Sequence, residues 1–225
     1  FSLNYHKHIH TGEGGVCVTE NQEFAERMQL IRNHAEAVVE GKGVKNLSNM
    51  IGFNFRMGEI EAALGIEQLK KLPQIIKEKV EWAGMLSDGL SKLNGLRTPI
   101  VKQHCSHVYY AYPLLVDQKM TNTHRDNIFK ALVAEGVPAL GDRYVNLHLY
   151  PMYQKKIAYG SYGFPWTSGL YKGNVNYSKG ICPIAEGMNE SRYINIGLGL
   201  IRLDQKKCNQ IIRCFEKVWG QLDHL

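Results

Sequence analysis

FSLNYHKHIHTGEGG, residues 1–15, is the stretch in which glycines and chemically reactive side chains are most concentrated. Ser2 is followed, after four intervening residues, by Lys7, and the run T-G-E-G-G then leads into an apolar segment at 15–19. That segment has the length and composition of a short buried strand. A lysine amine is a useful nucleophile only when part of its population is neutral, which burial or a neighbouring cation can achieve. By itself Lys7 is typical of a solvated surface lysine, so only the surrounding sequence can indicate a reactive role.

The three histidines around Lys7 permit a different interpretation. His6, His8 and His10 alternate, so a strand would project all three toward one face, where they could bind a metal ion. No acidic or cysteine partner stands nearby at ligand spacing, and we therefore predict no metal site. The glycines at 12–15 lack the G-x-x-x-x-G-K-[ST] spacing of a phosphate-binding loop, and no helix follows them directly. By themselves they indicate a glycine-rich turn before a strand.

Further motifs extend the pattern along nearly the whole chain. They are R-N-H at 32–34, GFNFRMGEIEAALG at 52–65, QLKKL at 68–72, YVNLHLYPMY at 144–153 and CPIAE at 182–186. Together with residues 1–15, and in this order, these segments resemble the DegT/StrS-type sugar-nucleotide aminotransferases. That family consists of fold-type I enzymes that use pyridoxal 5′-phosphate (PLP). The match over the first hundred residues is the more specific part.

The resemblance implies roles for three residues. Lys7 matches the lysine to which the family's enzymes attach the cofactor, and Ser2 matches a serine that contacts the cofactor phosphate. Asn54 matches an asparagine that reaches across a dimer interface to the neighbouring subunit's cofactor phosphate. Ala35 replaces the glycine that usually follows R-N-H. Once released by substrate, the same lysine can move a proton to and from the substrate carbon.

The resemblance also implies an α/β fold, the C-terminal part of a fold-type I PLP-dependent transferase. Residues 1–95 then correspond to a remnant of the PLP-binding large domain with the interdomain helix, and residues 96–225 to the small C-terminal α/β domain. In the family, roughly half of the chain precedes the cofactor lysine. That half supplies the aromatic residue that stacks on PLP and the acidic partner of the pyridinium nitrogen. We therefore expect an incomplete chain that is inactive in isolation.

Periodicity and capping residues predict the elements of the first hundred residues. Asn21 can cap a helix that carries Phe24 and Ile31, and residues 36–50 form a polar, glycine-containing loop. A second helix begins near position 56. A proline inside a helix costs about 3 kcal/mol, so Pro73 predicts a break or kink before a further helix over 74–94.

The remaining residues favour an antiparallel sheet covered by helices. Residues 108–116 are typical of a strand, in which Pro113 implies an edge or a bulge. Thr123 and Asp126 resemble a capping box for a helix over 124–135. The other predicted elements are a long loop over 141–180 and a final amphipathic helix over 205–222 that Asp204 caps.

Composition narrows the class of protein. The formal net charge of +6 favours anionic partners, but the charges are dispersed, so we predict a small anionic substrate or cofactor and no nucleic acid. Five scattered cysteines without a C-x-x-C pair indicate reduced thiols and a cytoplasmic protein. No apolar run reaches the roughly 18 residues of a membrane span, so we predict no membrane association.

Two functions therefore compete. One is a PLP-dependent aminotransferase that acts on a keto-sugar, with a sugar nucleotide as substrate, glutamate as the amino donor and a homodimer as the assembly. The other is a non-catalytic remnant or interaction module of the same family. The family's dehydratases and regulators also bind PLP, so the resemblance implies the cofactor more directly than the reaction.

Overall fold

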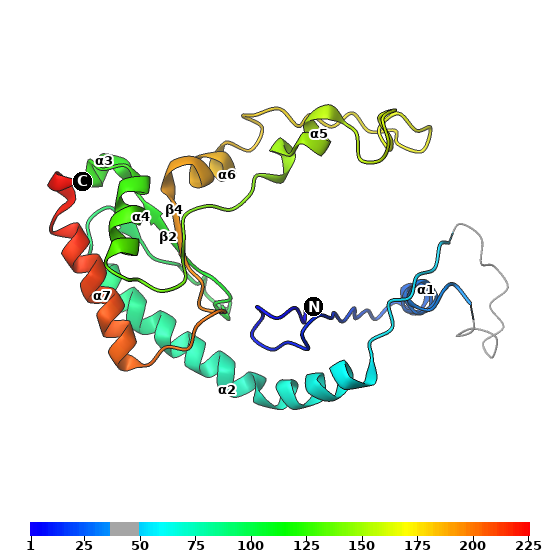
Figure 1. The fold of residues 1–225 in the computed structure, drawn as a ribbon, viewed down its shortest axis with the longest axis horizontal. Coiled ribbons are helices and arrows are strands. Elements are labelled where there is room, and N and C mark those ends of the chain that lie inside the picture. The colour runs from blue at the N-terminus through cyan, green and yellow to red at the C-terminus, as the bar shows by residue number, and fades with distance from the viewer. Residues whose placement is uncertain (37–49) are drawn as a thin grey trace. The chain divides into compact units, whose positions relative to one another are not determined.

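The computed structural model describes residues 1–36 and 50–225 (Figure 1). The predicted loop at 36–50 therefore lies almost wholly outside the described residues. By the density of internal contacts the chain divides into two compact units, Phe1–Lys77 and Glu78–Leu225. The predicted division near residue 95 concerns the domains of a longer fold and stays a prediction.

The first unit contains α1 (Gln22–Arg32) and the beginning of α2 (Glu59–Leu90). Asn21 caps α1 as predicted, because its side-chain oxygen accepts the Phe24 N–H at 3.0 Å. The predicted strand at 15–19 is wrong: only Gly15 makes a bridge, to Ser2, and the segment is exposed. A strand obtains its hydrogen bonds from neighbouring strands, and none of the described residues runs beside this segment as a strand.

The long helix α2 corrects a second prediction. It runs through Pro73 as one helix, so the predicted break is wrong, and it ends at Leu90. Its buried side chains are Lys79, Trp82, Ala83, Leu86 and Leu90, a stripe at helical spacing. Burial of these side chains and the hydrogen bonds on either side of the proline offset the local cost of about 3 kcal/mol.

The second unit is built on a four-stranded antiparallel sheet in the order β1-β2-β4-β3. The strands are β1 (Leu96–Arg97), β2 (Tyr112–Val116), β3 (Leu140–Gly141) and β4 (Tyr193–Ile196). The predicted strand and its antiparallel pairing are thus confirmed, although the strand begins at Tyr112.

Pro113 lies in the second strand of this sheet, and the register explains why a proline is tolerated there. Pro113 pairs with Asn195 of β4, whereas β1 lies opposite only the last two residues of β2. The side of Pro113 that faces away from β4 therefore has no ladder partner. A residue without an N–H fits such a local edge.

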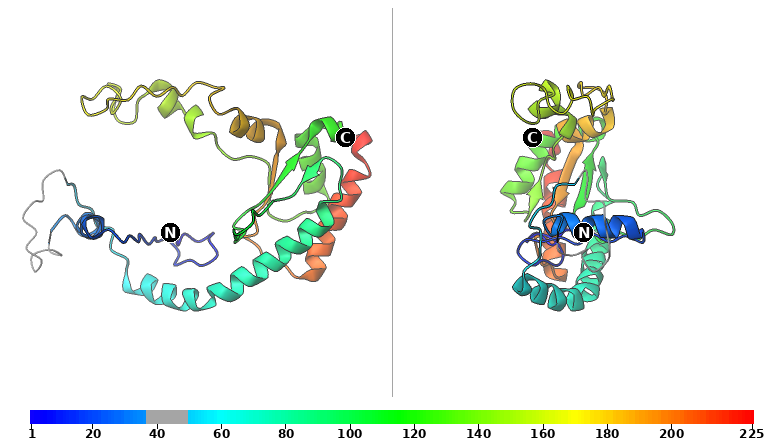
Figure 2. Two further views of the ribbon diagram at one scale, coloured as in Figure 1. Left: turned by 180° about the vertical axis from the view of Figure 1, so that it is seen from behind. Right: turned by 90° about the vertical axis from the view of Figure 1, so that its right-hand side faces the viewer.

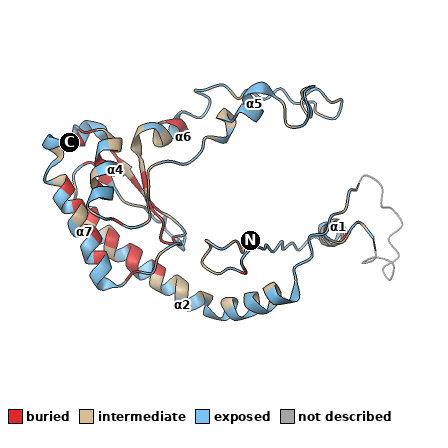
Figure 3. Cartoon of the chain, in the orientation of Figure 1, coloured by how far each residue is buried: buried red, intermediate tan, exposed pale blue. Residues whose placement is uncertain are grey.

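Helices cover one face of the sheet. α4 (Arg125–Ala134) and α7 (Gln205–Trp219) lie on the same side of it in both orientations (Figures 1 and 2). Alternate residues of β2 and β4 are fully buried, and buried side chains concentrate where these strands meet α2, α4 and α7 (Figure 3). Both predicted covering helices are confirmed.

The caps of these helices are confirmed in one case and corrected in the other. Asp204 caps α7 by accepting the Lys207 N–H at 2.7 Å, as predicted. α4 is capped by His124, whose Nδ1 accepts the Asp126 N–H at 3.2 Å, so the predicted capping box at Thr123 is wrong. The Thr123 hydroxyl instead donates to carbonyl oxygens of Thr121 and Leu222.

Arg125, the first residue of α4, is fully buried and ties the helix to the sheet. Its guanidinium donates to the carbonyl oxygens of Tyr193, Asn189 and Glu190 at 2.8–3.2 Å. Its Nε lies 2.7 Å from a carboxylate oxygen of Asp126. A buried cation is tolerated only when it is paired and hydrogen-bonded in this way.

Short elements complete the second unit. They are α3 (Gln118–Thr121), the 3-10 turn Leu147–Leu149, α5 (Pro151–Lys155), α6 (Pro183–Gly187), a π-helical turn Met188–Arg192 and the 3-10 turn Leu222–His224. The predicted loop at 141–180 is therefore mostly irregular, with two short helical turns. Among the described residues, no helix is both long enough and apolar enough to cross a membrane.

Candidate functional site

Lys7 lies in a loop that backbone hydrogen bonds close at its base. The Leu3 N–H donates to the Gly14 carbonyl at 2.9 Å, and the Val16 N–H donates to the Phe1 carbonyl at 2.8 Å. The Lys7 N–H itself donates to the Asn4 carbonyl at 3.0 Å. These bonds place the lysine in a turn between two paired segments, and its side chain is partly buried.

The T-G-E-G-G run has a specific role in this loop. Thr11 is 4% exposed, and its hydroxyl donates to the Glu13 carbonyl at 2.9 Å. A Cβ on Gly14 would lie 2.7 Å from the Thr11 hydroxyl oxygen. Gly12 has a φ of +87°, which favours glycine. The run therefore encodes one turn shape, with a buried threonine at its centre.

The turn also explains a glycine of the second motif. A Cβ on Gly65 of α2 would lie 3.3 Å from the Thr11 methyl group, and a Cβ on Gly14 would lie 3.4 Å from the end of Met57. The lysine loop thus packs on the beginning of α2 and the residues before it. Segments 1–15 and 52–65, which sequence reasoning could only list separately, meet in one unit.

Ser2 stands at the base of the loop. Its backbone pairs with Gly15, and its hydroxyl oxygen accepts the Asn4 N–H at 3.3 Å. Because that bond uses an oxygen lone pair, the hydroxyl proton stays available for donation to an external acceptor. The residue is exposed, as a group that contacts a ligand must be.

The three histidines around Lys7 do not line up on a strand. Residues 5–9 adopt turns and bends instead of a strand, so alternation does not place His6, His8 and His10 on one face. In the part of the chain that the structure describes, no group of three or more histidine, cysteine or acidic side chains is arranged to hold a metal ion.

Asn54 lies on an extended segment that pairs with the end of α1. The Phe53 N–H donates to the Ile31 carbonyl at 2.7 Å, and the Phe55 N–H donates to the Arg32 carbonyl at 3.0 Å. The rings of Phe53 and Phe55 stack with centroids 4.9 Å apart. The Asn54 backbone is therefore fixed from both sides, while its side chain is exposed.

The R-N-H motif and the GFNFR motif form this structure together. Asn33 makes a β-bridge with Asn54, and the Asn33 side-chain oxygen accepts from Arg56 Nη1 at 2.6 Å. Ala35 adopts a left-handed φ of +59°, which explains why glycine is usual at this position. A Cβ on Gly52 would lie 2.0 Å from the His34 backbone, so that position requires glycine.

A second polar cluster links the two later motifs. The buried Glu186 carboxylate lies 2.8 Å from His148 Nε2 and accepts N–H groups from Gly180 and Cys182 at 2.8–3.1 Å. Burial raises the pKa of the Glu186 carboxyl, but the hydrogen bonds from Gly180, His148 and Cys182 together lower it below its ordinary value. Segments 144–153 and 182–186 thus meet at the hydrogen bond between His148 and Glu186, which the separate motifs did not predict.

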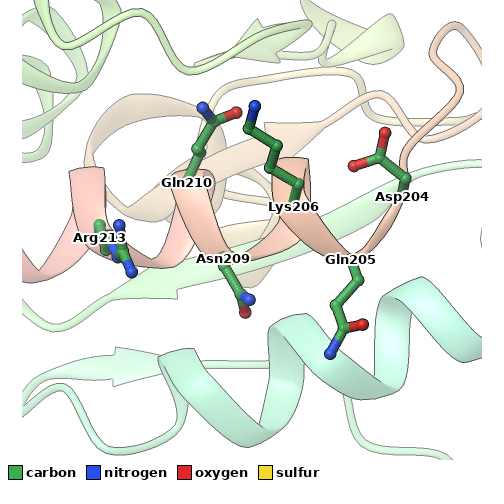
Figure 4. A pocket seen from close by; sticks show the side chains of 6 residues that line it. All are labelled: Asp204, Gln205, Lys206, Asn209, Gln210 and Arg213. Atoms are coloured by element: carbon green, nitrogen blue, oxygen red, sulfur yellow. The ribbon is translucent and has the colours of Figure 1, made fainter.

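A surface hollow lies away from these residues. Figure 4 shows it around the first turns of α7, lined by Asp204, Gln205, Lys206, Asn209, Gln210 and Arg213. None of the predicted site residues lines it, and its walls come from one helix and its cap. The candidate site is therefore the lysine loop and the Asn54 segment, not this hollow.

The family assignment rests on most of the chain. Residues 1–191 match the model of the DegT/DnrJ/EryC1/StrS aminotransferase family. The chain belongs to this family. Aminotransferases of the family are PLP-dependent, which agrees with a conspicuous lysine in a glycine-rich turn.

Two curated relatives illustrate the match. A UDP-4-amino-4,6-dideoxy-N-acetyl-beta-L-altrosamine transaminase of Helicobacter pylori is 36% identical over 163 residues, which is 70% of this chain and 40% of that protein. The spore coat polysaccharide biosynthesis protein SpsC of Bacillus subtilis is 29% identical over 178 residues, 76% of this chain and 46% of that protein. The chain spans about half the length of the curated relatives that it matches, or less.

The fold agrees with the family. The aminotransferase TlmJ of Streptoalloteichus hindustanus superposes with a TM-score of 0.71 at 22% identity, covering 99% of this chain and 52% of that structure. The predicted fold class, the C-terminal part of a fold-type I PLP-dependent transferase, is confirmed.

Proposed function

We propose that the protein containing this chain is a PLP-dependent aminotransferase that transfers an amino group from glutamate to a keto-sugar linked to a nucleotide. The observation that carries the proposal is the closed loop that carries Lys7 and has Ser2 at its base. Relatives support the substrate class, because the Helicobacter pylori protein is named as the transaminase of a UDP-sugar and a Caulobacter vibrioides relative as GDP-perosamine synthase.

The side chains of the candidate site fit PLP chemically. The cofactor carries an aldehyde and a phosphate. Lys7 offers a primary amine for the aldehyde, and the Ser2 hydroxyl retains a proton that can be donated to a phosphate oxygen. The Asn54 amide is a further phosphate donor, which we assign to the cofactor of a partner subunit. When bound, PLP supplies the electron sink that the reaction needs.

The side chains of the protein bind the cofactor, position it and transfer the proton. Lys7 holds the cofactor in place and, when substrate displaces it, its amine accepts and returns the proton of the substrate carbon. The turn around Thr11 fixes where that amine can lie, and a fixed position of reacting groups is a large part of catalysis. Ser2 and Asn54 orient the phosphate and leave Lys7 for the proton transfer.

We infer a homodimer, with the 56–72 region near the contact. Ile60, Ile66 and Leu69 of α2 are 59–76% exposed, and the stacked Phe53 and Phe55 lie on the segment that carries Asn54. Several large apolar side chains exposed on one short stretch of chain are typical of protein interfaces. Light scattering at micromolar concentration tests this: a monodisperse monomer would contradict it.

A cytoplasmic location is part of the same proposal. The five cysteines are free thiols in the structure, as expected of a reducing compartment. The competing function, a non-catalytic interaction module, is favoured by the second unit, which has a hydrophobic core of its own. We expect the 225-residue chain alone to bind PLP weakly and to turn over negligibly, because the stacking aromatic and the pyridinium partner belong to the family's preceding half.

The test of the aminotransferase is spectroscopic. The protein that contains this chain, with any preceding segment, should acquire visible absorbance on addition of PLP and lose it when glutamate is added. Lys7→Ala should abolish the absorbance and amination of the sugar nucleotide, whereas Lys217→Ala, a surface lysine paired with Glu135, should leave both unchanged. Amination that persists in Lys7→Ala would refute the role of Lys7.

A further inference from the structure

Asn54 combines a fixed backbone with an exposed side-chain amide. Its neighbours Phe53 and Phe55 both donate their N–H groups to the end of α1. The Asn54 amide is exposed and makes no hydrogen bond with another residue that the structure describes. An amide held ready in this way costs less conformational entropy when it meets a ligand.

The Arg56 guanidinium adds a side-chain bond to these backbone hydrogen bonds. Its Nη1 donates to the Asn33 side-chain oxygen at 2.6 Å and lies 3.5 Å from His34 Nε2. Asn33 is also the residue whose backbone bridges Asn54. The side-chain bond between Arg56 and Asn33 therefore reinforces the backbone pairing of Asn33 with Asn54.

We propose that Arg56 and Asn33 are positioning residues for Asn54. Their contact holds the extended segment against the end of α1 and so aims the Asn54 amide at the cofactor phosphate. The inference rests on the proposed function, because it takes Asn54 to be a phosphate donor. It adds that the R-N-H motif contributes to cofactor binding through the position of another residue, without contact with the cofactor.

A guanidinium can also bind a phosphate directly, and the two roles differ in a measurable way. If Arg56 acts only through Asn54, its removal has little further effect once the Asn54 amide is gone. If it contacts the phosphate itself, the two effects add. A double-mutant cycle separates these cases.

The experiment measures the dissociation constant of PLP, by absorbance titration, for the full protein and for the variants named below. We expect Asn54→Ala and Arg56→Ala each to weaken PLP binding by roughly tenfold, the loss of about one hydrogen bond to a charged group. The double variant should be no more than about twice as weak as Asn54→Ala. Asn33→Asp, whose carboxylate can still accept from Arg56, should bind PLP within about threefold of the parent. Lys217→Ala, at a surface lysine paired with Glu135, is the control.

Hydrogen exchange supplies a readout that does not depend on the cofactor. In the absence of PLP, the Phe55 amide should exchange about tenfold faster in Arg56→Ala than in the parent and return toward the parent rate in Asn33→Asp. Unchanged exchange in Arg56→Ala would overturn the positioning role.

The remaining outcomes are also decisive. If Asn54→Ala weakens PLP binding and Arg56→Ala does not, or if the two losses add, the inference is wrong while the proposed function stands. If Asn54→Ala has no effect while Lys7→Ala abolishes binding, the assignment of Asn54 fails and the inference fails with it. If neither Asn54→Ala nor Lys7→Ala affects PLP binding, the proposed function itself is wrong.

Discussion

Replacing Arg125 by methionine should destabilise the second unit strongly, and the structure sets the size of the effect. The guanidinium is fully buried and donates to three carbonyl oxygens, those of Tyr193, Asn189 and Glu190, and its Nε lies 2.7 Å from an Asp126 carboxylate oxygen. Methionine fills most of the volume but offers no donor, so these acceptors lose their partner. Each acceptor that loses its partner away from water costs about 1–3 kcal/mol, so with three carbonyl oxygens affected we expect the free energy of unfolding to fall by about 3 kcal/mol or more.

Urea unfolding followed by tryptophan fluorescence measures this loss, because Trp82 and Trp219 report on the core of the same unit. Arg143→Met is the matched control. Arg143 also pairs with Asp126, at 3.3 Å, but its side chain is 58% exposed, and water screens such a pair. We expect the control to unfold at the parent's urea concentration. Equal midpoints for the two variants would refute the reasoning that burial, not pairing as such, determines the cost.

Three further predictions concern other parts of the chain. Gly14→Ala should open the lysine loop, because a Cβ at this position would lie 2.7 Å from the Thr11 hydroxyl oxygen. Faster hydrogen exchange of the Leu3 amide measures the opening. Adding Thr11→Ala to this variant should relieve most of the effect, and exchange that stays equally fast would contradict the steric explanation. Ala35→Gly should raise the free energy of unfolding of the first unit by about 1 kcal/mol, because glycine adopts a φ of +59° without strain. Hydrogen exchange measures this free energy. A lower value in the variant would contradict the prediction. The pKa of Glu186 is lowered in the folded state, so the stabilising contribution of this carboxylate is complete above the unfolded-state pKa and is lost as pH falls through the folded-state pKa. Urea midpoints measured across the acidic range should therefore fall less steeply with pH in Glu186→Gln than in the parent. Parallel curves for the two proteins would exclude this role.

Local patterns in the sequence predicted the elements whose formation is local. Asp204 and the apolar spacing after it specify α7, because a cap and an amphipathic stripe are properties of neighbouring residues. The segment at 15–19 failed as a strand since a strand depends on a partner from elsewhere in the chain. Pro73 misled for the related reason that burial of Trp82 and Leu86, on tertiary contact, outweighs a local propensity.

In the candidate site, too, single residues could be predicted from the sequence, whereas contacts between distant residues could not. Lys7, Ser2 and Asn54 could be singled out because their motifs resemble a known family. The bond between Arg56 and Asn33, and the contact of Thr11 with the helix of the second motif, join residues separated by more than twenty positions. No periodicity or spacing within either motif specifies such pairs, although the co-occurrence of R-N-H and GFNFR was a signal that they could meet.

The central claim is that Lys7 carries the cofactor, and one measurement tests it most directly. The protein that contains this chain, with any preceding segment, is incubated with PLP, reduced with borohydride, digested and mapped by mass spectrometry. We expect the pyridoxyl phosphate mass on the peptide that contains Lys7. Lys7→Ala should abolish this labelling, and Lys70 should stay unmodified. Stoichiometric labelling of another lysine in the parent, with Lys7 unmodified, would contradict the account.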